Sequence, residues 1–238
     1  MTFSDLLLEN IFLQEDSIGK RSAKVVIYAG RFQPFHMGHY QAYKSLVSIF
    51  GHEDVYIATS NVTNLTNSPM TFKDKKEFIT QMFDVPSSQV VQVKNPYAPT
   101  EILSKYDSNS SIYVAAVSQK DADRLNHGQY FTPFTNKANT SYLNKGYTYV
   151  YPMSPFQLNG QDISASMIRK ISISNKSDQV KRSFFKKIYP KYNDHLYQAL
   201  IDNLNSTRES INDKLMNEGG AAGHMLHPFE DKDITFNE

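Results

Sequence analysis

Lys24-Val-Val-Ile-Tyr-Ala-Gly30 runs directly into Arg31-Phe-Gln-Pro-Phe-His-Met-Gly-His39, and this stretch decides the fold. Its first part is an apolar run that predicts a buried strand over residues 24–29. An amphipathic pattern follows the second part and predicts a helix over residues 38–50. A strand that turns into a helix is the repeating unit of a parallel α/β sheet. The turn itself lies where such sheets bind phosphates.

The residues of this turn are chemically suited to phosphate. Gly38 has no Cβ, so a phosphate chain can lie directly on its backbone. His36 and His39 can donate N–H bonds to phosphate oxygens, most strongly when protonated, and Arg31 adds a planar donor fork. The alternative is a structural loop with two incidental histidines. The strand before the turn and the helix after it favour a phosphate site.

Gly30-Arg-Phe-Gln-Pro-Phe-His-Met-Gly-His39 resembles the GRFxPFHxGH signature of the HxGH-type nucleotidylyltransferase superfamily. It is most similar to archaeal-type nicotinamide-mononucleotide (NMN) adenylyltransferases, because cytidylyltransferases more often open with a G-T-F-D type sequence. The resemblance implies a Rossmann-like, doubly wound parallel sheet with helices on both faces. It also implies that His36 and His39 stabilise the reacting α-phosphate. The nucleotide and its phosphates would be held by Gly30, Arg31, Phe32 and Gly38.

A second motif, Asp162-Ile-Ser-Ala-Ser-Met-Ile-Arg169, resembles the I-S-x-T-x-[IV]-R signature of the same superfamily. The residues alone predict a helix N-terminus with Asp162 or Ser164 as its N-cap. The resemblance implies that Arg169 is catalytic and that Ile163, Ser164 and Ser166 bind phosphate. An ordinary capped helix is the alternative, but the order and distance of the two motifs favour the phosphate role.

The stretch from Asn67 to Glu77 resembles the N-P-F-T-x-x-E-R segment of the family. That resemblance implies that Asn67 and Thr71 bind the acceptor. The alternative is that Thr71 simply caps a helix over residues 73–83.

The stretch from Val114 to Arg124 reads as strand, turn and helix, and resembles the family's segment near the nucleotide ribose and base. Lys120 would contact phosphate, and Asp121 would cap the helix or touch ribose. Lys44, one turn past His39, either reaches back to a phosphate or is a solvated lysine on a helix face.

The resemblance implies that a phosphomonoester oxygen attacks the α-phosphorus of a nucleoside triphosphate and that pyrophosphate leaves. ATP and NMN, giving NAD, are the substrates that it favours. The attacking phosphate is already an anion, so the reaction needs positioning and charge stabilisation rather than a side-chain nucleophile. We expect Mg²⁺ to arrive with the triphosphate and expect no metal site made of protein side chains.

Three other interpretations stay open. A cytidylyltransferase acting on a polyol phosphate would keep the chemistry and change the substrates. A class I aminoacyl-tRNA synthetase shares the two-histidine turn, but the short chain and the missing K-M-S-K-S loop count against it. A non-catalytic nucleotide-binding or assembly module of a larger polypeptide is the rival from another class. Intact His36, His39 and Arg169 count against that module.

Composition limits the class of protein. The 238 residues, 40% of them hydrophobic, suffice for one α/β domain with a full core. A formal net charge of +1 without a basic stripe gives no indication of nucleic-acid binding. The absence of cysteine excludes disulfides and suits a reducing cytoplasm. No apolar run approaches the roughly 18 residues that span a bilayer, so we expect no membrane partner.

We expect three parts: an N-terminal amphipathic segment and linker (1–22), a nucleotidylyltransferase domain (23–205), and a C-terminal helix with a Gly-rich tail (206–238). Gly219 to Asp231 resembles a short element of bacteriophage multidomain proteins. That resemblance suggests a viral source, hence a host cytoplasm, and a further domain beyond residue 238. Archaeal-type relatives often assemble, so a homo-oligomer is also expected.

Overall fold

The structure, a computed structural model, describes residues 20–63, 68–152 and 155–218, with side chains as far as residue 206. The chain divides into two compact units. The first contains residues 1–32, 38–61 and 84–154, and the second contains residues 33–37, 62–83 and 155–238. The predictions for residues 1–19, for Asn67 and for the tail after residue 218 lie outside the described residues.

The first unit is built on a six-stranded sheet in which every neighbouring pair is parallel. The strand order is β3-β2-β1-β4-β6-β5. The chain therefore runs from β1 outward to β3 and then returns to the other side of β1, which makes β1 and β4 the topological switch point. The predicted doubly wound sheet is confirmed. Its strands are β1 (Lys24–Ala29), β2 (Val55–Thr59), β3 (Val90–Gln92), β4 (Ile112–Val117), β5 (Phe131–Pro133) and β6 (Gly146–Val150), with a 3₁₀ turn η1 (Ser87–Gln89) before β3.

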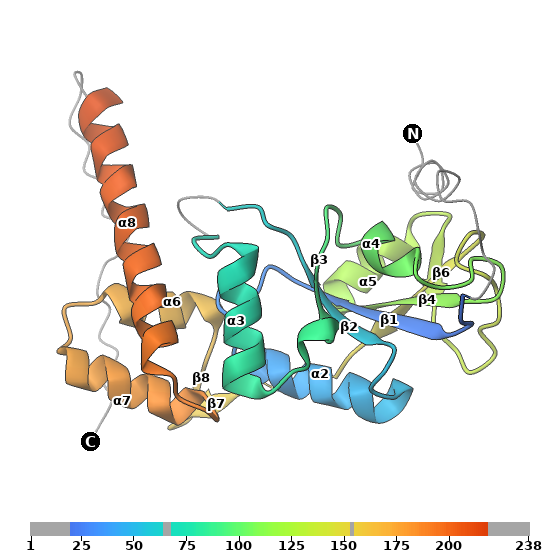
Figure 1. Ribbon diagram of the computed structural model, residues 1–238, viewed down its shortest axis with the longest axis horizontal. Helices are drawn as coiled ribbons and strands as arrows, with labels where there is room; N and C mark the ends of the chain where they lie inside the picture. Colours follow the sequence, from blue (N-terminus) through green and yellow to red (C-terminus); the bar gives the residue numbers. More distant parts are fainter. Residues whose placement is uncertain (1–19, 64–67, 153–154, 219–238) are drawn as a thin grey trace. The chain divides into compact units, whose positions relative to one another are not determined.

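Helices cover both faces of this sheet (Figure 1). Helix α2 (Met37–Phe50) lies on one face, whereas α4 (Thr100–Leu103) and α5 (Gln119–Asn126) lie on the other. Residues 25–28 of β1 are all buried, and their side chains point alternately to the two faces of the sheet, so Val25 and Ile27 share one core cluster with Ile102 of α4 and Ala122 of α5. Strand β4 is buried along its whole length, as expected for a central strand of a parallel sheet.

The polar stretch over residues 126–145 contains an element that sequence reasoning missed, strand β5. Its aromatic residues Tyr130 and Phe131 are 6% and 4% exposed and belong to the core cluster. The Phe131 ring packs edge-on against Tyr113 of β4, and the Tyr130 hydroxyl donates to the carbonyl of Tyr142. These rings therefore anchor the segment on the sheet.

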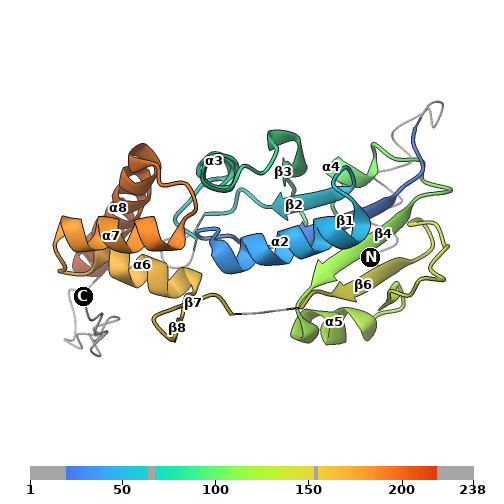
Figure 2. The same cartoon turned by 90° about the horizontal axis from the view of Figure 1, so that it is seen from below.

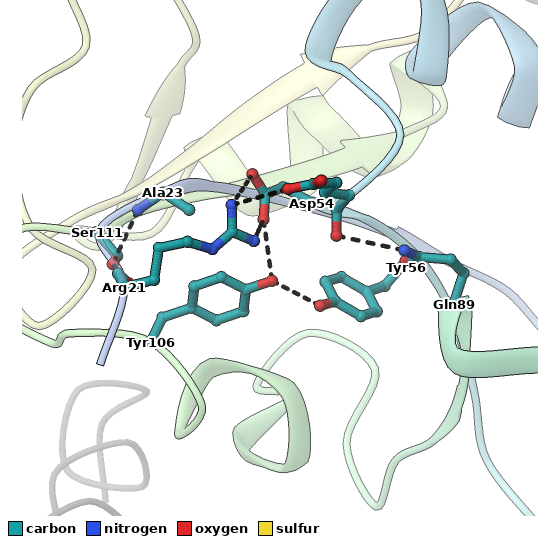
Figure 3. A network of polar contacts seen from close by, with 8 residues as sticks. Arg21, Ala23, Asp54, Tyr56, Gln89, Tyr106 and Ser111 are labelled. Atoms are coloured by element: carbon teal, nitrogen blue, oxygen red, sulfur yellow. Dashed lines mark hydrogen bonds and ion pairs between the residues drawn. The ribbon is translucent and has the colours of Figure 1, made fainter. Parts of the chain in front are cut away.

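A polar network ties the amino end of the sheet together (Figure 3). The Arg21 guanidinium pairs with Asp54, just before β2, and with Glu53 at 3.5 Å. Tyr106 donates to Asp54 at 3.1 Å and shares a 2.6 Å hydrogen bond with Tyr56. Because this network lies at the amino ends of the strands, it stabilises the edge opposite the β1 turn.

The second unit consists of helices α3 (Phe72–Phe83), α6 (Ala165–Ile173), α7 (Asp178–Ile188) and α8 (Asp194–Glu218), with a two-stranded hairpin of β7 (Gln157–Leu158) and β8 (Gln161–Asp162). Both views show α6, α7 and α8 side by side (Figures 1 and 2). Arg182 joins α7 to α8, because it pairs with Asp178 at 2.5 Å and also with Asp194.

Candidate active site

The turn after β1 is held in shape by the Phe32 ring. Phe32 has a φ of +48°, a left-handed conformation that is uncommon outside glycine, and its side chain is 4% exposed. The ring lies so close to Gly30 that a Cβ there would meet it at 2.6 Å. It contacts the Tyr28 ring at 5.3 Å and stands edge-on to the His39 imidazole at 5.1 Å. Gly30 is therefore required by packing, and Phe32 braces His39.

Helix α2 begins at Met37, so Gly38 and His39 lie in its first turn, where backbone N–H groups point out of the helix. Arg31, also predicted to bind phosphate, has an exposed side chain beside this turn. Lys44 is exposed one turn further and lies 5.7 Å from the Tyr40 ring. It borders a surface pocket of about 260 Å³ between α2 and residues 84–86.

The turn after β4 is organised by a helix cap. Ser118 accepts from the Asp121 N–H at 3.3 Å and donates to the Asp121 carboxylate at 2.9 Å. Ser118, rather than the predicted Asp121, is therefore the N-cap of α5, and Asp121 supports it while also binding Arg124 at 3.1 Å. Arg124 additionally donates to the Tyr97 hydroxyl at 2.8 Å, while Lys120 is exposed. Sequence reasoning missed Arg124, although its i, i+3 spacing from Asp121 was a signal.

The second unit contains the other half of the signature, Gln33–Met37. The Gln33 amide makes two 2.9 Å hydrogen bonds with the backbone of Met70, one to the carbonyl and one from the N–H. The Gln33 carbonyl accepts from the Arg169 guanidinium. The Phe35 carbonyl accepts from the Tyr189 hydroxyl at 3.2 Å. The segment is therefore held by hydrogen bonds at three groups, the Gln33 amide, the Gln33 carbonyl and the Phe35 carbonyl.

His36 is nearly buried, with 8% of its surface exposed. Burial lowers the pKa of His36 to about 4, because the charged imidazolium loses its hydration. Its ring is consequently neutral at neutral pH and offers one N–H donor. The sequence suggested that a protonated histidine would bind phosphate most strongly. The lowered pKa of His36 instead indicates a neutral imidazole.

The second motif forms a helix N-terminus, as predicted. Of the two candidate N-caps, Ser164 is the cap, since its hydroxyl accepts from the Met167 N–H at 3.2 Å. Ser166 lies 3.0 Å from that hydroxyl, and both serines are exposed. Asp162 instead accepts from Gln157 within the β7–β8 hairpin. Ile163 is 5% exposed and holds the turn by donating its N–H to the carbonyl of residue 156 at 2.8 Å.

Thr71 begins α3 with a capping box. Its hydroxyl accepts from the Asp74 N–H at 3.3 Å, and its own N–H and hydroxyl donate to the Asp74 carboxylate at 2.9 and 2.8 Å. The cap was one of the two predicted alternatives for Thr71. Lys75, which follows, is 1% exposed, and burial lowers its pKa to about 8. The sequence places either Lys75 or Lys76 where the family has arginine, and it could not single out Lys75, because the neighbouring lysines look alike in the pattern.

Among the described residues, no group of three or more His, Asp or Glu side chains gathers as a metal ion requires. In the same part of the chain, no helix is long and apolar enough to cross a membrane.

Residues 27–171, more than half of the chain, match the cytidylyltransferase-like family. The chain belongs to this family. The match runs from β1 to α6 and includes both signature motifs. Family membership identifies the protein as a nucleotidylyltransferase-superfamily member. Among curated proteins, none matches the chain significantly in sequence.

Solved structures of similar fold include a bifunctional NMN adenylyltransferase/ADP ribose pyrophosphatase from Francisella tularensis, complexed with AMP and a manganese ion. Its TM-score is 0.42 at 16% identity, over 84% of this chain and 57% of the Francisella protein. The chain thus spans little more than half of that protein. A Plasmodium falciparum nicotinic acid mononucleotide adenylyltransferase complexed with NaAD has a TM-score of 0.46 at 13% identity, over 80% of this chain and 98% of its own.

Proposed function

We propose that this cytidylyltransferase-like protein transfers an adenylyl group from ATP to a phosphomonoester, with NMN as the acceptor and NAD and pyrophosphate as the products. The observation that carries the proposal is the turn after β1, where Phe32 packs on Gly30 and braces His39 in the first turn of α2. The sequence Arg-Phe-Gln-Pro-Phe in that turn favours adenylyl over cytidylyl transfer.

The residues of the first unit suit the reacting phosphate. Gly38 and His39 lie in the first turn of α2, where the helix dipole places a partial positive charge. Arg31 adds a permanent cation. In the reaction an acceptor phosphate oxygen bonds to the α-phosphorus, and the bond to the bridging oxygen of the β-phosphate breaks. His39 donates to the oxygens that gain charge, and no proton has to be removed from the acceptor.

The residues of the second motif suit the departing pyrophosphate. Ser164 and Ser166 present exposed hydroxyls at the N-terminus of α6, and Arg169 follows one turn later. His36 would instead join His39 at the α-phosphate, where it contributes a neutral N–H. Mg²⁺ fits this set as a companion of the triphosphate, because these side chains are hydrogen-bond donors to phosphate rather than carboxylate ligands of a cation. It would neutralise charge on the leaving pyrophosphate.

A second candidate keeps the chemistry and replaces ATP with CTP and NMN with a polyol phosphate. The match to a cytidylyltransferase-like family favours it. The two candidates are separated by pyrophosphate release with ATP or CTP against a panel of phosphomonoesters in the presence of Mg²⁺. Turnover with ATP and NMN supports the proposal, and turnover only with CTP replaces the substrates.

The same assay decides between an enzyme and a non-catalytic module. His39→Ala should abolish turnover while nucleotide affinity changes modestly. The matched control is His127→Ala, an exposed histidine that caps the C-terminus of α5. It should keep full activity. Nucleotide binding without turnover by the unmodified protein would favour the module.

A further inference from the structure

Gln33 connects two parts of the second unit that are far apart in sequence. Its side-chain amide pairs with both backbone polar groups of Met70, 37 residues away, at 2.9 Å each. Its backbone carbonyl accepts from the Arg169 guanidinium, 136 residues away. Gln33 and Met70 are only 3% and 1% exposed, so the two hydrogen bonds between them are shielded from water. A buried donor or acceptor that loses its partner costs free energy, so breaking the hydrogen bonds between Gln33 and Met70 is unfavourable.

The two ends of the connection have different predicted roles. Met70 directly precedes Thr71, a predicted acceptor residue that caps α3. Arg169 is predicted to act on the triphosphate. The segment between them is stiff, since Phe35, two residues after Gln33, is fully buried, packs on Phe83 at 5.1 Å, and has its carbonyl bound by Tyr189. A shift of Arg169 is therefore passed to Met70 rather than absorbed by the segment between.

We propose that Gln33 is a positioning residue that couples Arg169 to the acceptor-side segment around Met70. Gln33 itself does not touch the reacting atoms. When the triphosphate attracts the Arg169 guanidinium, the Gln33 carbonyl bound to it shifts. The Gln33 side-chain amide then shifts the backbone of Met70 through its two hydrogen bonds. Nucleotide binding thereby positions the segment around Met70 for the acceptor. The inference rests on the proposed function for its kinetic consequence, but its structural core does not require activity.

The structural core is tested by hydrogen exchange at the Met70 amide in the protein without nucleotide. Gln33→Met removes the acceptor of this N–H and should speed its exchange. Arg169→Met touches Met70 nowhere, yet coupling predicts that it also speeds that exchange, by about 3-fold or more. In the Gln33→Met background, Arg169→Met should add nothing. An unchanged Met70 amide in Arg169→Met, or fully additive effects, would overturn the coupling even if the protein has no enzymatic activity.

The kinetic consequence is tested with whichever nucleotide and acceptor the wild type turns over. Loss of two buried hydrogen bonds in Gln33→Met should raise the acceptor KM on the order of 10- to 30-fold. The dissociation constant for the magnesium nucleotide should stay within about 2-fold, because the carbonyl that binds Arg169 remains. Equal weakening of acceptor and nucleotide binding, or a loss of activity explained by a smaller folded fraction, would contradict a positioning role for Gln33.

The matched control is Gln89→Met, which removes a second buried glutamine amide, bonded to the Glu53 carbonyl at 3.3 Å in the first unit. It should leave the acceptor KM and Met70 exchange unchanged. If the wild type turns over no substrate pair, the proposed function fails, while the exchange experiment still decides the coupling.

Discussion

Gly30→Ala should disable the β1 turn by displacing Phe32. An added Cβ would lie 2.6 and 2.7 Å from two atoms of the Phe32 ring, whereas ordinary contacts begin near 3.4 Å. The ring must therefore move by about 0.8 Å, the difference between 3.4 and 2.6 Å. It cannot swing away cheaply, because it is 4% exposed and in contact with Tyr28 and His39.

The expected magnitude follows from that displacement. Overpacking of this kind costs about 1–3 kcal/mol of unfolding free energy. Misplacing a catalytic group by about 1 Å costs on the order of 100-fold in rate. We therefore expect kcat to fall by roughly 100-fold in Gly30→Ala, while nucleotide binding is largely retained. The assays are urea denaturation for stability and pyrophosphate release, corrected for the folded fraction, for activity.

Gly146→Ala is the matched control. A Cβ at Gly146 would meet the Tyr130 and Phe131 rings at 2.5 and 2.6 Å, an equally severe clash at the start of β6. It should cost similar stability and leave kcat per folded molecule unchanged. Gly30→Ala/Phe32→Leu should regain stability without regaining the rate, because the ring that braces His39 is gone. Wild-type kcat in Gly30→Ala, or an equal rate loss in Gly146→Ala, would refute the reasoning.

Three further predictions concern stability and capping. The folded pKa of His36, about 4, lies below its unfolded value of 6.5, so stability is complete above pH 6.5 and is lost as pH falls towards 4. We expect a loss of about 2 kcal/mol at pH 5, measured by urea denaturation, and a flatter profile in His36→Gln. Ser164→Ala should cost about 1 kcal/mol of stability as a lost N-cap and lower the rate as well, whereas Ser177→Ala, the N-cap of α7, should cost stability alone. Asp54→Asn weakens the network at the amino edge of the sheet and should lower the melting temperature without changing kcat, and a reduced kcat per folded molecule would contradict its purely structural role.

Much of the fold was predictable because its signals are local. The apolar run of β1 and the glycine after it gave both ends of the strand, and Ser164 was one of the two N-caps predicted for α6. Strand β5 was not predictable, since three residues at a sheet edge in a polar segment carry no periodicity. Helix α4 was not predictable from periodicity either, because it has only four residues, Thr100–Leu103.

The sequence predicts which residues form the candidate site but not which contacts they make. The signature singles out Phe32, but its positive φ and its packing on Gly30 depend on a backbone that no pattern specifies. The Gln33–Met70 pair joins residues 37 positions apart, and only the folded chain brings them together. The burial of Lys75 likewise depends on tertiary packing, because its lysine neighbours are not buried.

The central claim is that the chain transfers a nucleotidyl group by attack at the α-phosphorus, and isotopic labelling tests it most directly. The protein is incubated with Mg²⁺, NMN and ATP labelled at either the α- or the γ-phosphorus, with His39→Ala in parallel. The account predicts that the α-label enters a dinucleotide and that the γ-label leaves in pyrophosphate. With His39→Ala, neither labelled product should form. Transfer of the γ-label to the acceptor, or no labelled product with ATP or CTP and any acceptor, would contradict it.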